Sequence, residues 1–75
     1  MHLSEAAPPI SLVEQLEVVV KARTNGLVRN LSIARYGNEV VLSGTTHTYY
    51  TKQLATHAVY EALQGVTLTN NIEVD

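Results

Sequence analysis

Several residue types are missing from this 75-residue chain, and their absence excludes classes of structure and chemistry. There is no cysteine, so disulfides, thiolate nucleophiles and thiolate metal sites are excluded and stability must come from packing. No apolar run approaches the 18 or so residues of a membrane span. Residues 1–10 show no export-signal pattern. We therefore expect a cytoplasmic protein, or a periplasmic one if a signal peptide has been removed.

Charge is also scarce. Charged residues make up 16% of the chain, against about 25% in typical soluble domains. A net charge of −2 argues against nucleic-acid binding, because domains that bind nucleic acid without sequence preference usually have a pI above about 9. Four basic residues nevertheless fall in an acid-free stretch, and they form the candidate patch for an anionic membrane surface: Lys21, Arg23, Arg29 and Arg35.

Catalytic and metal-binding patterns are absent as well. A chain this short forms one domain and has little room for a catalytic cleft. His2, His47 and His57 do not share a ligand spacing with each other or with an acid, and no glycine-rich phosphate cradle is present. We expect His57 to be a half-buried ring bonded to Tyr50 or Glu61. We expect no catalytic, metal or cofactor-binding residue and no small-molecule substrate.

The first predicted element is an amphipathic helix that begins after a flexible tail over residues 1–10. Ser11 and Glu14 fit a capping box, which places the start of the helix at Ser11. Asn25-Gly26 supplies the left-handed positions that end it. The apolar arc of this helix comprises Leu12, Val13, Leu16, Val19 and Val20.

From Val28 the hydrophobic period changes to two, which predicts a hairpin around Gly37-Asn38. Glycine at the first loop position favours a type II′ turn. That turn sets three cross-strand pairs: Tyr36 with Glu39, Ile33 with Leu42, and Leu31 with Gly44. The opposite face of the hairpin then carries small uncharged side chains.

A second helix is predicted from Thr48 to about Leu63, ended by Gly65, and a third strand follows with period two. The buried arc of this helix comprises Leu54, Ala55, Ala58, Val59 and Ala62, and its alanines allow close approach to a sheet. Residues 11–75 thus form a single α+β domain with the order αββαβ, with two helices packed on one face of a three-stranded sheet. A right-handed crossover makes the second and third strands parallel, so the sheet is mixed if they are neighbours and antiparallel if the first strand separates them.

The pattern resembles a BON domain (bacterial osmotically inducible and nodulation domain), present here as a single copy. The resemblance rests on Asn38-Glu39-Val40-Val41-Leu42-Ser43-Gly44, on the alanine-rich second helix, and on Gly65-Val66 followed by Asn70-Asn71-Ile72-Glu73-Val74. It implies the αββαβ fold and a role in phospholipid binding or in interactions at membranes. Within it, Gly44 is interpreted as the point where a strand passes beneath a helix, and Asn70 as a buried amide bonded to a loop.

One face of the second helix carries the candidate interaction surface: Tyr49, Lys52, Gln53, Thr56 and Tyr60. Tyrosine suits interfaces because its ring can be buried while its hydroxyl stays wet. The alternative is that these rings pack against the first helix or the sheet edge. We therefore expect a non-enzymatic interaction module that binds another protein or itself through uncharged surface. The alternative function is peripheral binding of anionic phospholipid through the basic patch.

Overall fold

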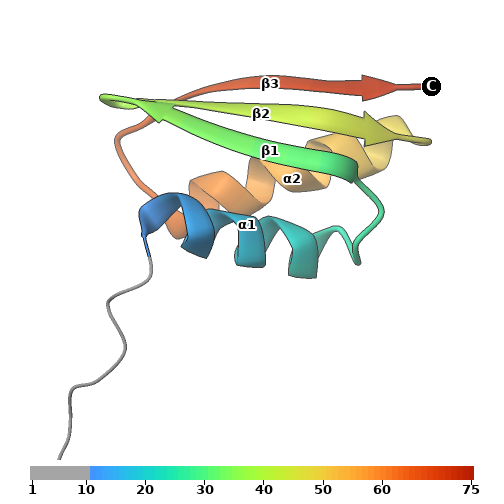
Figure 1. The fold of residues 1–75 in the computed structure, drawn as a ribbon, viewed down its shortest axis with the longest axis horizontal. Helices are drawn as coiled ribbons and strands as arrows, with labels where there is room; N and C mark the ends of the chain where they lie inside the picture. The colour runs from blue at the N-terminus through green and yellow to red at the C-terminus, as the bar shows by residue number, and fades with distance from the viewer. Residues whose placement is uncertain (1–10) are drawn as a thin grey trace, which may run out of the picture.

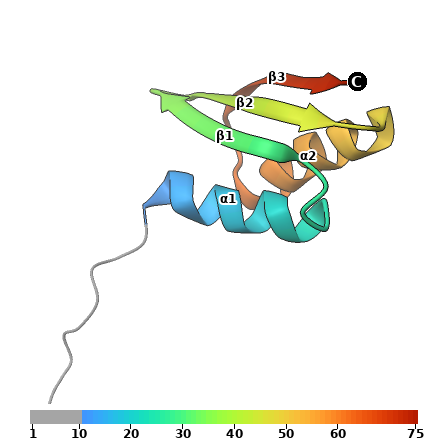
Figure 2. The same ribbon diagram turned by 45° about the vertical axis from the view of Figure 1, so that its right-hand side comes forward.

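The computed structural model describes residues 11–75, which form an α+β domain with two helices on one face of a three-stranded sheet (Figures 1 and 2). This confirms the predicted fold class. The predicted tail over residues 1–10 lies outside the described residues. The elements in chain order are α1 (Leu12–Arg23), β1 (Arg29–Tyr36), β2 (Glu39–Thr46), α2 (Tyr49–Ala62) and β3 (Thr67–Val74).

The sheet is mixed, with β2 between its two neighbours. β1 pairs with β2 in antiparallel fashion, and β2 pairs with β3 in parallel. This is the predicted alternative in which the second and third strands are neighbours. Both β1 and β3 are therefore edge strands, and α2 is the crossover that connects the two parallel strands.

The hairpin follows the predicted register up to an irregularity in β1. Tyr36 pairs with Glu39 and Ile33 with Leu42, as predicted. The Leu31–Gly44 pair was predicted wrongly, because a register shift between Arg29 and Ser32 removes it from the ladder. Asn30 lies within this bulge at φ 57°, a left-handed conformation that asparagine tolerates better than most residues.

Gly44 makes its close approach to β1 rather than to a helix, which corrects the interpretation given above. A Cβ atom at this position would lie 2.8 Å from Cγ1 of Val28 and 2.9 Å from the carbonyl oxygen of Arg29. The φ of Gly44 is +147°, which side-chain-bearing residues rarely adopt. Glycine therefore lets the start of β1 cross close over β2.

Both helices begin at the predicted caps. The Ser11 hydroxyl accepts from the Glu14 amide and the Glu14 carboxylate accepts from the Ser11 amide, each at 3.1 Å, which completes the capping box. Thr48 caps α2 by accepting from the Thr51 amide at 3.1 Å. Local sequence alone thus determines where each helix starts.

The core lies between the sheet and the two helices, and two positions of α2 differ from the predicted arc. Ala62 is exposed and Leu54 is half-buried, so neither belongs to the buried face. α2 ends at Ala62, and Leu63 packs against the core from an extended backbone instead. The buried apolar residues are Leu16, Val20, Val28, Ile33, Val40, Leu42, Ala55, Ala58, Val59 and Ile72.

Three threonines are also buried, although periodicity did not indicate them. The Thr24 hydroxyl donates to the Val20 carbonyl at 2.7 Å, and the Thr46 hydroxyl donates to the Leu27 carbonyl at 3.0 Å. The hydroxyls of Thr51 and Thr48 lie 2.8 Å apart. Each buried hydroxyl therefore has a partner, as burial of a polar group requires.

We predict that Ala58→Leu destabilises the protein by about 1–3 kcal/mol, because Ala58 is fully buried and a larger side chain overpacks the core. Ala62→Leu on the same helix is the matched control, since Ala62 is exposed and leaves the free energy of unfolding nearly unchanged. Chemical denaturation measures both. An unchanged midpoint for Ala58→Leu would show that this helix face does not pack as described.

Candidate interaction surface

The structure brings the five predicted residues together on one side of α2, here called the α2 stripe: Tyr49, Lys52, Gln53, Thr56 and Tyr60. The side chains of Tyr49 and Tyr60 remain 64% and 49% exposed, so neither ring is buried against α1 or the sheet. Thr56 contacts β3 through Asn70, whereas Glu61 lies on another side of the helix and pairs with Arg23 of α1. The α2 stripe therefore borders the free edge of β3.

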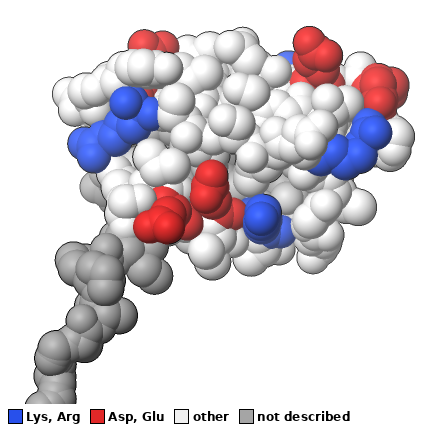
Figure 3. All heavy atoms as spheres, in the orientation of Figure 1, with Lys and Arg blue, Asp and Glu red and all other residues white. Residues whose placement is uncertain are grey.

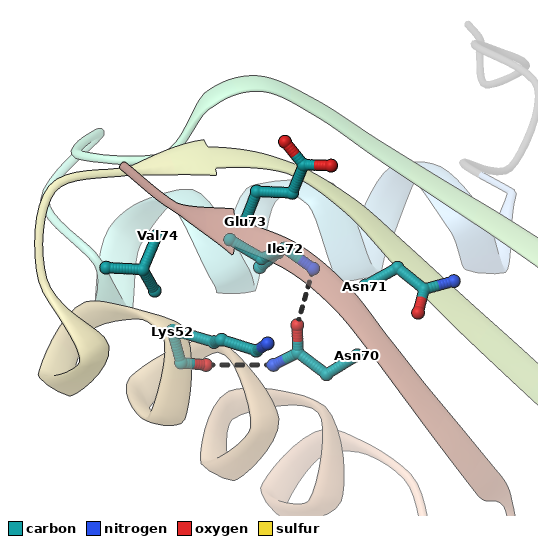
Figure 4. Close-up of a pocket in the computed structure, with 6 residues that line it drawn as sticks. All are labelled: Lys52, Asn70, Asn71, Ile72, Glu73 and Val74. Atoms are coloured by element: carbon teal, nitrogen blue, oxygen red, sulfur yellow. Dashed lines mark hydrogen bonds between the residues drawn. The ribbon is translucent and has the colours of Figure 1, made fainter.

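An open groove of about 610 Å³ lies along β3 beside Lys52, the one residue of the α2 stripe that lines it (Figure 4). Figure 4 shows Asn70 pointing from β3 toward α2, while Glu73 points away from the helix. Only Lys52 among the lining residues was predicted from sequence, because the period-two pattern identifies the others as strand residues without showing what lies beside them. The lining comprises Lys52, Asn70, Asn71, Ile72, Glu73 and Val74.

The side-chain amide of Asn70 joins the two walls of this groove. Its Nδ2 donates to the Lys52 carbonyl oxygen at 2.9 Å and to the Thr56 hydroxyl at 2.8 Å. Its Oδ1 accepts from the amide of Ile72 at 3.0 Å. Asn70 is half-buried and ties β3 to a helix, which corrects the expectation of a buried amide bonded to a loop.

The backbone of β3 alternates between its neighbour and the open edge. The amides of Thr67 and Asp75 donate to the carbonyl oxygens of Asn38 and Thr46 at 2.9 and 3.0 Å. Because backbone groups alternate along a strand, the even-numbered amides point away from β2. Asn70 Oδ1 accepts from the amide of Ile72. Among the described residues, three outward amides of β3 then have no partner: those of Leu68, Asn70 and Val74.

The four residues of the predicted basic patch are not gathered on one surface. Arg23 pairs with Glu61, and Arg29 pairs with Asp75. Arg35 lies near the hairpin turn, about 20 Å along β1 from Arg29 at the usual rise per residue. Lys21 is exposed on α1. Figure 3 shows separate basic groups on this face, with acidic groups between them.

Charged groups do meet at the end of the sheet opposite the hairpin turn. Arg29 Nη2 lies 2.6 Å from Asp75 Oδ2, and His47 Nδ1 lies 2.8 Å from Asp75 Oδ1. The hydrogen bond from Arg29, assisted by that from His47, lowers the pKa of the Asp75 carboxyl group against a smaller opposing effect of desolvation. This arrangement holds a carboxylate between two donors at the surface.

The prediction that His57 is a half-buried ring bonded to Tyr50 or Glu61 was wrong. His57 is exposed, not half-buried, and Glu61 is engaged by Arg23. His2 lies outside the described residues. Within residues 11–75 no group of three or more histidine, aspartate or glutamate side chains is arranged to hold a metal ion. In the same part of the chain, no helix is long and apolar enough to cross a membrane.

Comparisons of the chain with protein families, curated proteins and solved structures found no match. The BON-domain resemblance therefore stays a prediction.

We predict that the Asp75 carboxyl group titrates below the usual value of an aspartate, as measured by its NMR chemical shift. The folded-state pKa is lowered, so the carboxylate stabilises the fold above its unfolded-state pKa and loses this effect as pH falls through the folded-state pKa. Arg29→Gln should move the midpoint upward, whereas the control Arg35→Gln should leave it in place. A midpoint insensitive to Arg29→Gln would contradict the contact.

Proposed function

We propose that the protein is a non-enzymatic interaction module that binds another protein through the α2–β3 surface, meaning the α2 stripe together with the free edge of β3. The observation that carries this proposal is that two features lie next to each other, on the α2 stripe and on the edge of β3 that its residues contact. The α2 stripe carries two exposed tyrosine rings, and the edge of β3 carries outward backbone amides. Rings supply apolar area to a partner, and backbone amides supply directional bonds.

The energetics favour this surface because little charge must be desolvated. Tyr49 and Tyr60 could each contribute on the order of 1.5–3 kcal/mol if fully buried by a partner. Lys52 is the only basic residue of the α2 stripe, and the Glu73 carboxylate points away from the helix. A partner that covers the α2 stripe and the edge of β3 therefore meets mostly rings, hydroxyls and amides, and the polar groups among them can be buried at little cost if the partner hydrogen-bonds to them.

The bare face of the sheet is a weaker candidate for the same role. It carries small side chains such as Ala34, Val41 and Ser43. Three strands of eight residues, spaced about 4.8 Å apart with a rise of about 3.3 Å per residue, cover roughly 400 Å². A stable interface usually buries about 800 Å² on each partner. The footprint of this face is therefore about half of that area.

Binding of anionic phospholipid is not favoured by any arrangement of the described residues. Each basic residue near an anionic surface is worth about 1 kcal/mol, and the sum requires the residues to face one way. Arg23 and Arg29 are engaged by Glu61 and Asp75 instead. Phospholipid binding, which the BON-domain resemblance implies, is therefore the competing function that the liposome experiment below distinguishes.

The test compares proteins captured from a lysate of the source organism by the wild type and by two double variants, with quantification by mass spectrometry. Tyr49→Ser/Tyr60→Ser removes two exposed rings from the α2 stripe. Tyr36→Ser/Tyr50→Ser removes two exposed rings outside it. We predict that at least one captured protein falls roughly tenfold or more with the first variant only, because loss of two buried rings weakens binding by several kcal/mol.

Equal recovery by both variants would contradict the proposal. Circular dichroism verifies that each variant is folded. Liposome co-sedimentation provides the competing outcome: binding that is strong with anionic lipid, lost in salt and lost in Arg29→Glu/Arg35→Glu would place the phospholipid function first.

A further inference from the structure

We infer that the partner contributes an extended segment that adds to β3 as a fourth strand and places an acidic side chain beside Lys52. This inference rests on the proposed function and specifies the partner's chemistry. Three features carry it: the open hydrogen-bonding edge of β3, the groove beside that edge, and the ammonium group of Lys52, which has no ion-pair partner within residues 11–75.

The edge of β3 is open to strand addition. The outward amides of Leu68, Asn70 and Val74 follow one another along the strand, and only that of Ile72 is taken by a side chain of the same strand. Edge strands are commonly protected by lysine, proline or bulges. β1 has a bulge and two arginines, whereas β3 has no bulge, no proline and a single charged residue, Glu73. β3 is therefore the edge at which an extended chain can bind.

The groove accommodates the side chains of such a segment. In an added strand, alternate side chains would point toward the helix layer, where the groove lies between β3 and Lys52. The Asn70 bonds to Lys52 and Thr56 hold the helix beside the strand, so the groove exists before a partner binds. Peptide recognition by strand addition uses this combination of a backbone edge with side-chain pockets.

A second copy of the chain fits this edge less well than a single extended segment. Paired strands lie about 4.8 Å apart, whereas packed helices require about 8–10 Å. Because Asn70 holds α2 directly against β3, pairing two β3 strands would bring two α2 helices together before the strands could bond. An extended segment without a helix beneath it meets no such obstacle.

Lys52 indicates which charge the partner segment should carry. It is the only lysine or arginine in α2 and β3, and within residues 11–75 it takes part in no ion pair. It is half-buried at the groove, where an opposing carboxylate would be partly shielded from water. A two-fold pairing centred on β3 would instead oppose two Lys52 ammonium groups. An acidic residue in the partner segment is the complementary choice.

The experiment is a selection from a phage-displayed library of random dodecapeptides against the immobilised full chain. Three targets are compared: wild type, Lys52→Glu, and Lys21→Glu, which makes the same charge change on the exposed face of α1. We expect wild type and Lys21→Glu to enrich peptides that share one aspartate or glutamate position. Lys52→Glu should lose that preference and select lysine or arginine there.

Hydrogen exchange then locates the peptide. The most enriched wild-type peptide, added at saturation, should slow exchange of the Leu68, Asn70 and Val74 amides at least tenfold. Val74→Pro, which removes one outward amide from the edge, should weaken peptide binding at least tenfold, whereas Val74→Ala, which keeps that amide, should not.

Several results would overturn the inference: no enriched peptide, an acidic preference retained by Lys52→Glu, or unchanged exchange of these amides. Sedimentation that shows a dimer with the same amides protected in the absence of peptide would identify a second copy as the occupant. In each case, tyrosine-dependent capture from lysate would still support the proposed function, so the two failures are distinguishable.

Discussion

The three hydrogen bonds of the Asn70 side chain are the interaction on which the rest of the candidate surface depends. Asn70 lies on β3, and its side-chain NH2 group donates to the Lys52 carbonyl and the Thr56 hydroxyl of α2. Its side-chain oxygen accepts from the Ile72 amide. An apolar residue here would leave the strand and helix joined by packing alone. The amide instead sets their spacing by directional bonds, because a half-buried polar group is stable only with its partners in place.

Local chemistry explains why much of the fold could be predicted. The Ser11 capping box, the Thr48 cap and the turn at Gly37-Asn38 depend on neighbours within a few residues, so the sequence shows them directly. The bulge at Asn30 and the exposure of Ala62 depend on how β1 crosses β2 and where α2 leaves the sheet. These are tertiary constraints, which the hydrophobic periodicity of the sequence does not reveal.

The same distinction applies to the candidate surface. Tyr49, Gln53, Thr56 and Tyr60 could be assigned to one side of α2 because the helical period places them there. The groove could not be predicted, since it requires β3 to pair parallel to β2 and so to lie beside Lys52. Proximity in sequence did not predict whether the basic residues form one patch, because the extended backbone of β1 places Arg29 and Arg35 about 20 Å apart.

The most direct measurement is an NMR titration of the isotopically labelled protein with a partner recovered by tyrosine-dependent capture. The account predicts that the largest amide shift changes fall on the α2 stripe and on residues 68–74 of β3, with Lys21 and Arg35 unaffected. Changes confined to the bare sheet face, or to residues around Arg29 and Arg35, would contradict it and place the binding surface elsewhere.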